Sequence, residues 1–239
     1  MKSKQIFIFL GPPGAGKGTL SRLCVSHFGW AQLSTGDLCR QHIIDQTEIG
    51  KQIDFIIKSG RLIPDGLMID MVEAWILEKF KSINVLILDG FPRTLMQAKA
   101  LDALLAKEAF SGIAFHVIQL VIDDKHVINR LLGRLICSSK ECGVVYSKNI
   151  VDLQPHQGTI CNYCGTKLIV RSDDNMQSIK HRLEVYHKHA NALLDYYHHH
   201  KGLSCNENTV KTLEVNKPLT EVFVEFERLS GVSRVNLVP

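Results

Sequence analysis

The sequence lacks any apolar run long enough to cross a membrane, and it has no internal repeat or low-complexity tract. A membrane-spanning helix needs roughly 18 or more consecutive apolar residues, and no stretch of the 239 residues approaches that length. The excess of positive charge is also small, because the formal net charge is only +4. This balance suits small phosphorylated ligands and does not demand a nucleic acid. We therefore expect a globular protein that binds neither membranes nor nucleic acids.

The chain also has no evident export signal. The first ten residues, MKSKQIFIFL, combine basic and apolar side chains, but the apolar part is short and runs directly into a glycine-rich loop. We interpret this segment as a buried strand. Seven cysteines without an export signal are expected to be mostly reduced, so we expect a cytoplasmic location.

Short apolar runs alternate with segments of helical periodicity along most of the chain. The runs are residues 6–10, 85–88, 117–122 and 210–215, with a weaker candidate at 30–33. This alternation predicts an α/β fold with a five-stranded parallel sheet flanked by helices. Ligands of such sheets bind at the carboxyl ends of the strands. The residues that follow each run are therefore candidates for a site.

The first run ends in GPPGAGKGT, residues 11–19, which has the pattern of a phosphate-binding loop. Its N–H groups can surround phosphate oxygens, and a helix starting near Lys17 adds its positive end. The common pattern has a serine or threonine directly after the lysine to hold Mg²⁺, but here that position is Gly18. A plain glycine turn is disfavoured because strand, loop, lysine and helix occur in the required order.

Two further strand ends carry polar motifs. In LSTGDLCR, residues 33–40, Ser34 or Thr35 can cap a helix. Taken alone, this motif is better explained by a capped helix with a solvated Arg40 than by a binding site. In LDGFPRT, residues 88–94, Asp89 can hold metal-bound water beside the loop. Arg93 can form two hydrogen bonds with a phosphate.

The segment that follows begins a helix. Thr94 and Gln97 have the spacing of a capping box, in which each side chain bonds a backbone N–H of the other residue. That structural role alone would explain Gln97.

Together these motifs resemble those of adenylate kinases over nearly the whole chain. The resemblance rests on GPPGAGKGT, STGDLCR, LDGFPRTLMQ, NRLLGR at 129–134, RSDDN at 171–175 and HRLEVYH at 181–187. It implies a phosphate-loop kinase core at 1–33, 64–132 and 175–239, an AMP-binding insertion at 34–63 and a lid at 133–174. It also implies a monomer that transfers a phosphoryl group reversibly from Mg·ATP to AMP, giving two ADP. In that family Mg²⁺ is held through ATP oxygens and water, which accounts for Gly18.

The resemblance also implies the site residues. Catalytic roles would fall on Lys17, Arg93, Arg134, Arg171 and Arg182. ATP would contact Gly14, Ala15, Gly16, Lys17, Gly18, Thr19, Arg130, Arg134, Val145, Tyr146 and Lys217. AMP would contact Thr35, Arg40, Arg61, Leu62, Ile63, Gly90, Phe91, Pro92, Arg93, Gln97, Arg171 and Arg182, with Gln97 at the adenine edge. Asp89 would hold Mg²⁺ through water. Arg182 follows the buried stripe of its helix, so it could instead face water.

Residues 137–170 lack helical periodicity and indicate a small inserted module. Its second cysteine pair, Cys161 and Cys164, has the C-x-x-C-G spacing of a zinc knuckle. The first pair, Cys137 and Cys142, is spaced C-x-x-x-x-C, whereas zinc-bearing members of the family have C-x-x-C. Four thiolates on a structural Zn²⁺ would let so small a module fold; free thiols or a disulfide are the alternatives. The other cysteines are expected in core or neutral positions: Cys24, Cys39 and Cys205.

Two other functions fit parts of the pattern. One is another nucleoside-monophosphate kinase, a UMP/CMP kinase or a GTP:AMP phosphotransferase, although Thr35 and the long lid with its cysteines resemble adenylate kinases more. The other is a nucleotide-responsive binding module whose zinc knuckle contacts a nucleic acid or another partner. That contact would use Tyr146, Tyr163 and nearby lysines.

Overall fold

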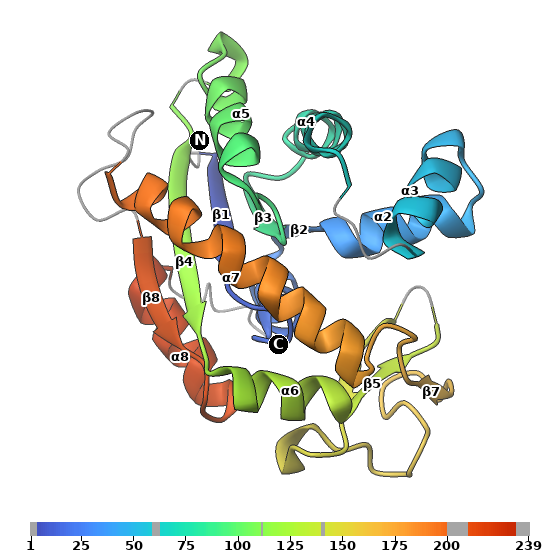
Figure 1. Ribbon diagram of the computed structural model, residues 1–239. Coiled ribbons are helices and arrows are strands. Elements are labelled where there is room, and N and C mark those ends of the chain that lie inside the picture. The colour runs from blue at the N-terminus through green and yellow to red at the C-terminus, as the bar shows by residue number, and fades with distance from the viewer. Residues whose placement is uncertain (1–3, 59–62, 111, 140–141, 200–209, 233–239) are drawn as a thin grey trace.

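A five-stranded parallel sheet forms the centre of the computed structural model, which describes residues 4–58, 63–110, 112–139, 142–199 and 210–232 (Figure 1). Its strands lie in the order β2-β3-β1-β4-β8, and every neighbouring pair is parallel. They are β1 (Gln5–Leu10), β2 (Ala31–Ser34), β3 (Val85–Asp89), β4 (Ala114–Val121) and β8 (Val210–Glu214). The predicted α/β fold with five parallel strands is confirmed.

The fourth strand begins earlier than the apolar run predicts. β4 starts at Ala114, three residues before the expected start, and contains His116. The imidazole of His116 stacks on the ring of Phe7, with ring centroids 4.6 Å apart. Burial lowers the pKa of His116, and the nearby charge of Lys211 lowers it further. A polar residue that is kept neutral in the sheet therefore interrupted the apolar pattern without ending the strand.

Alternate residues of β1 point to opposite faces of the sheet, as the two-residue period of a strand requires. Ile6 and Ile8 pack with α4 (Asp65–Lys79) and α5 (Leu95–Leu105) on one face. The rings of Phe7 and Phe9 pack on the other face, where α1 (Lys17–Phe28) and α8 (Leu219–Ser230) cover them. Both faces are thus buried, which explains why the strands read as continuous apolar runs.

One long helix, α7 (Met176–His199), contributes to both apolar clusters. Its first half supplies Ile179 and Leu183 to the cluster around Phe7, and its second half supplies Leu193 and Tyr197 to the other cluster. Figure 1 shows α7 running obliquely across the front of the sheet. No helix among the described residues is both long and apolar enough to span a bilayer.

Two smaller units extend from the sheet. One consists of α2 (Thr35–Ile44) and α3 (Glu48–Lys58), and it follows β2 directly. The other follows α6 (Asp124–Leu132) and is an antiparallel sheet in the order β6-β5-β7. Its strands are β5 (Arg134–Cys137), β6 (Val145–Ser147) and β7 (Leu168–Ile169), and short 3₁₀ helices lie at Glu108–Phe110 and Val151–Leu153. Figure 1 shows both units at the right of the large sheet.

Replacing Phe226 by alanine should lower the free energy of unfolding by about 3–5 kcal/mol, because the whole ring is buried and leaves a cavity. Phe226 packs edge-on against Phe7, Phe9 and Trp30, with centroid separations of 6.0, 5.6 and 6.2 Å. Urea unfolding followed by circular dichroism measures the loss. Val224→Ala on the same helix is the control, because Val224 is 58% exposed and its truncation should cost little. Equal losses in both variants would contradict this packing.

Candidate functional site

A cleft of about 820 Å³ opens beside the carboxyl ends of the strands, between the glycine-rich loop, α2 and the small sheet. Positively charged residues from separate parts of the chain line it: Lys17, Arg22, Arg40, Arg93, Arg130, Arg134, Arg171, Arg182 and Lys217. Every other described residue that the sequence assigned to the site also lines the cleft, with the exception of Phe91. The side chain of Phe91 is 1% exposed and belongs to the apolar core. Arg61 and Leu62 lie outside the described residues.

The glycine-rich loop is held closely by its neighbours. Gly14 has a φ of +80°, and a Cβ at this position would lie 2.8 Å from Cγ of Leu131, so the loop admits only glycine there. Arg130 donates to the carbonyl oxygen of Ala15 at 3.3 Å and to that of Val215 at 2.6 Å. Arg130 therefore ties the loop to the segment that follows β8.

Lys17 is the first residue of α1 and lies at the base of the cleft. Its Nζ donates to the carbonyl oxygens of Gly11 and Pro12, each at 2.8 Å. Burial lowers the pKa of Lys17 to about 8, against the opposing effect of the Asp89 carboxylate, and nearby arginines lower it further. The ammonium form still predominates at pH 7, so the loop carries a fixed positive charge.

Asp89 ends β3 and stands beside this lysine. Its carboxylate accepts a hydrogen bond from Nε2 of Gln32 at 3.2 Å. Burial raises the pKa of Asp89, while the charges of Lys17 and Arg93 oppose that rise. A Cβ on Gly18 would lie 3.2 Å from Oδ2 of Asp89, so a serine or threonine there would crowd the carboxylate. The carboxylate oxygen is a suitable ligand for Mg²⁺ or for its bound water.

Arg134 and Arg171 of the small unit and Arg182 of α7 converge with two aspartates. Nε of Arg134 donates to Asp174 at 2.7 Å, and Nη1 of Arg182 donates to Asp173 at 3.1 Å. Arg182 therefore lines the cleft instead of facing water only. Burial lowers the pKa of Arg171 to about 10, and the charge of Arg134 adds to that effect. Sequence reasoning gave no role to the two aspartates, although both stand in the RSDDN segment.

Arg171 also carries a donor that fits an anionic ligand. Its Nε is buried, and among the described residues it has no hydrogen-bond partner. Leaving such a donor unpaired is costly, and an anionic oxygen in the cleft would satisfy it. A second interaction joins this arginine to α2, where Nη2 of Arg171 lies 3.9 Å from Oδ1 of Asp37.

The turn after β3 and the start of α2 form another part of the cleft wall. The Oγ1 of Thr35 and the Nε of Arg93 donate to the carbonyl oxygen of Gly90, at 3.0 and 2.8 Å. Arg40 forms an ion pair with Asp37. Burial alone would raise the pKa of Asp37, but the Arg40 guanidinium outweighs it and holds that pKa below its usual value. Thr35, Arg40 and Arg93 thus lie on one side of the cleft.

The predicted capping box is only half formed. The Oγ1 of Thr94 accepts from the backbone N–H of Gln97 at 3.2 Å, as expected. The reciprocal bond does not go to Thr94, because Oε1 of Gln97 accepts from the backbone N–H of Arg93 at 2.8 Å. Nε2 of Gln97 donates to Oδ1 of Asp65 at 2.7 Å. The side chain of Gln97 therefore joins the turn after β3 to the start of α4.

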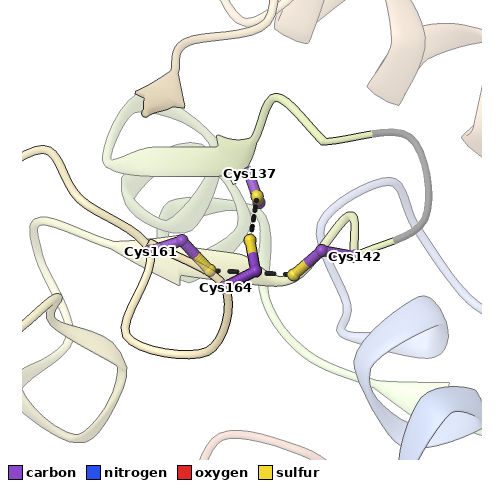
Figure 2. Close-up of side chains that lie close together, drawn as sticks. All are labelled: Cys137, Cys142, Cys161 and Cys164. Carbon is purple, nitrogen blue, oxygen red and sulfur yellow. Dashed lines mark hydrogen bonds between the residues drawn. The ribbon is translucent and has the colours of Figure 1, made fainter. Parts of the chain in front are cut away.

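The four cysteines of the small unit form one cluster, which Figure 2 shows in close-up. All four Sγ atoms lie within 4.8 Å of one another, and the nearest pairs are Cys137–Cys164 at 3.3 Å and Cys142–Cys161 at 3.7 Å. A tetrahedral zinc site with metal–sulfur bonds of about 2.3 Å has sulfur–sulfur edges of about 3.8 Å. These separations fit that geometry and exceed the length of a disulfide, about 2.05 Å.

The surroundings of Cys161 favour a thiolate. Burial opposes its ionisation, but hydrogen bonds from Tyr146 and from backbone N–H groups outweigh burial and lower the pKa of Cys161 to about 6. Metal ligands of this type bind as thiolates. Tyr146 also lines the cleft, so its ring lies between the cluster and the candidate nucleotide site.

The remaining cysteines have other surroundings. Cys24 and Cys39 are buried in the two apolar clusters of the core, and Cys205 lies outside the described residues. At the far end of the cleft, Lys217 forms an ion pair with Glu225, and Val145 lines the wall contributed by the small sheet.

Comparison with known proteins agrees with this geometry. The family model described as adenylate kinase matches residues 9–202. The chain belongs to the adenylate kinase family. It is 37% identical over 221 residues to the adenylate kinase of Borreliella burgdorferi, covering 91% of this chain and 98% of that one. It is 38% identical over 220 residues to that of Borrelia turicatae, covering 92% and 99%. It is 35% identical over 228 residues to that of Lachnospira eligens, covering 94% and 99%.

Membership of the adenylate kinase family makes the chain a nucleotide-binding phosphotransferase. It does not favour the UMP/CMP kinase or the GTP:AMP phosphotransferase that the sequence left open, since these relatives are all named adenylate kinase.

Proposed function

We propose that the chain transfers a phosphoryl group reversibly from Mg·ATP to AMP, giving two ADP, and that the cleft is its active site. The observation that supports this most is the convergence of Lys17 and seven arginines on one cleft beside a phosphate-binding loop. Anionic phosphate groups are the ligands that such a cleft attracts. The family match supports the same reaction.

In this proposal the two nucleotides occupy opposite ends of the cleft. Residues 14–19 hold the phosphates of ATP, and Arg130, Val145, Tyr146 and Lys217 surround the rest of that nucleotide. The AMP site comprises residues 34–63, the turn at 90–93 and Gln97. Residues 133–174 form a lid, and residues 1–33, 64–132 and 175–239 form the core. We also propose that the chain is a monomer, that it acts in the cytoplasm, and that it has no membrane or nucleic-acid partner.

The reaction needs positioning and positive charge more than acid–base chemistry. An oxygen of the AMP phosphate forms a bond to the γ-phosphorus of ATP, while the bond from that phosphorus to the bridging oxygen of ADP breaks. The attacking oxygen is already anionic, so no general base is required. Charge spreads over the equatorial oxygens of the transferred group, where Lys17, Arg93, Arg134, Arg171 and Arg182 can stabilise it. Mg²⁺, held through water by Asp89, would neutralise charge on the phosphate chain.

Water must be excluded during transfer, since it would otherwise accept the phosphoryl group. The lid lies against the core in this arrangement, because Arg22 of α1 donates a hydrogen bond to the carbonyl oxygen of Gly143. Arg171 of the lid also approaches Asp37 of α2. These contacts support an arrangement in which the lid and α2 cover the cleft when the nucleotides are bound.

The reaction and its acceptor can be tested together. Purified chain with Mg·ATP should form ADP from AMP far faster than from CMP or UMP, as measured by a coupled ADP assay. GTP should replace ATP poorly as the donor in the same assay. A preference for CMP over AMP would overturn the proposed acceptor.

Replacing Arg93 by alanine should lower kcat by about 10²- to 10³-fold, because a donor aimed at the charge of the transferred group is lost. The thermal unfolding midpoint should change little, because the side chain of Arg93 contributes no core packing. Arg228→Ala is the matched control, because the Arg228 side chain is 73% exposed and does not line the cleft. Turnover close to that of the wild type in the Arg93 variant would rule out its role.

We also propose that the four-cysteine cluster holds one structural Zn²⁺. Replacing Cys161 by serine should lower the bound zinc below one ion per chain and lower the thermal unfolding midpoint, because the metal contributes folding free energy to the lid. Elemental analysis and calorimetry, each with and without a chelator, measure both effects. Cys24→Ala, which changes a cysteine of the core, should leave the zinc content unaltered. Unchanged zinc in the Cys161 variant would contradict the four-sulfur site.

A further inference from the structure

The side-chain amide of Gln97 is fixed at both ends. Gln97 is 4% exposed, and it lines the cleft. Its Oε1 accepts from the backbone N–H of Arg93 at 2.8 Å, and its Nε2 donates to Oδ1 of Asp65 at 2.7 Å. An amide has two N–H donors and two acceptor lone pairs. One donor and one acceptor are therefore used by the protein, and one of each remains available to a ligand.

Asp65 is held in turn by the start of α5. Its second oxygen, Oδ2, accepts from Oγ1 of Thr94 at 3.1 Å, and Thr94 caps the helix that carries Gln97. Asp65 itself is the first residue of α4, directly after Pro64. Neither Asp65 nor Thr94 lines the cleft. The carboxylate thus acts on a ligand only through Gln97.

These partners allow the amide one orientation. A half-turn of the amide would place Nε2 against the N–H of Arg93, so that two donors would face each other. The same half-turn would place Oε1 against the carboxylate of Asp65, so that two acceptors would face each other. Buried polar groups that lose their partners in this way are strongly disfavoured. Gln97 therefore presents its free donor and its free acceptor in a fixed order.

A donor and an acceptor in fixed positions can distinguish two kinds of purine base. Adenine offers an amino donor at N6 and an acceptor at N1, whereas hypoxanthine offers an acceptor at O6 and a donor at N1. An amide that rotates freely can pair with either base, but a fixed amide can pair with only one. We propose that Asp65 is a positioning residue that fixes the amide of Gln97 and thereby makes the acceptor site select AMP over 6-oxopurine monophosphates such as IMP. This inference rests on the proposed function, in which Gln97 faces the base of AMP.

The test compares AMP and IMP as acceptors in Asp65→Ala, with ATP as the donor. The ratio of kcat/KM for AMP to that for IMP should fall about 10-fold or more, because the orientation penalty against IMP is reduced. KM for AMP should rise more than its kcat falls. A purely structural role would lower kcat/KM for both acceptors equally, and an unchanged ratio would overturn the inference. Asp65→Leu replaces both oxygens by methyl groups on a side chain of the same branched shape, and it tests the same expectation if the alanine variant does not fold.

Two further variants complete the experiment. Asp65→Asn keeps an oxygen for Nε2 of Gln97 and an N–H for Thr94, so it should retain most of the preference for AMP; a loss as large as that of Asp65→Ala would contradict the role of orientation. Asp70→Ala, at an exposed position of α4, should leave the ratio unchanged. A wild-type chain that does not prefer AMP over IMP would instead count against the proposed acceptor site, whatever the Asp65 variants do.

Discussion

The guanidinium groups of Arg134, Arg171 and Arg182 repel one another. The cleft nevertheless requires all three to stay close together. Burial lowers the pKa of Arg171 and Arg182, and the charge of Arg134 lowers both further. Asp173 and Asp174 offset this repulsion, because they pair with Arg182 and Arg134 just before α7 begins. The remaining repulsion destabilises the folded chain, and a bound anionic ligand would offset part of that destabilisation. A preorganised site of this kind needs little rearrangement when charge develops on a transferred group.

Much of the core could be predicted from the sequence because a parallel sheet covered on both faces has strands of continuous apolar residues. Five such runs were enough to identify the α/β fold, and the polar motifs after them indicated where a site would form. Apolar runs did not predict the start of β4, because His116 in that strand is polar. Its imidazole is nevertheless stacked on the ring of Phe7. Phe91 shows a related limit, because a residue in a site motif can turn its side chain into the core.

Two carboxylate partners in the site could not be predicted, because they are distant in sequence from the residues they bind. Asp174 lies 40 residues from Arg134, and Asp65 lies 32 residues from Gln97. Such pairs depend on how distant segments of the chain come together in the fold, and no local spacing encodes them. The cysteine cluster is an intermediate case. The C-x-x-C spacing of Cys161 and Cys164 could be recognised in the sequence. The longer spacing of Cys137 and Cys142 is explained only by the fold, in which β5 brings Cys137 close to Cys164.

The small sheet, which belongs to the proposed lid, has few apolar side chains of its own. Its cluster of buried apolar residues consists of Leu135, Cys137, Tyr146, Cys161 and Leu168, and two of them are cysteines of the proposed metal site. A chain deprived of zinc would therefore keep its five-stranded core and its glycine-rich loop but lose the order of its cover. Such a chain would still capture ATP while exposing it to solvent. Metal supply would then determine what share of the protein has an ordered cover over its cleft.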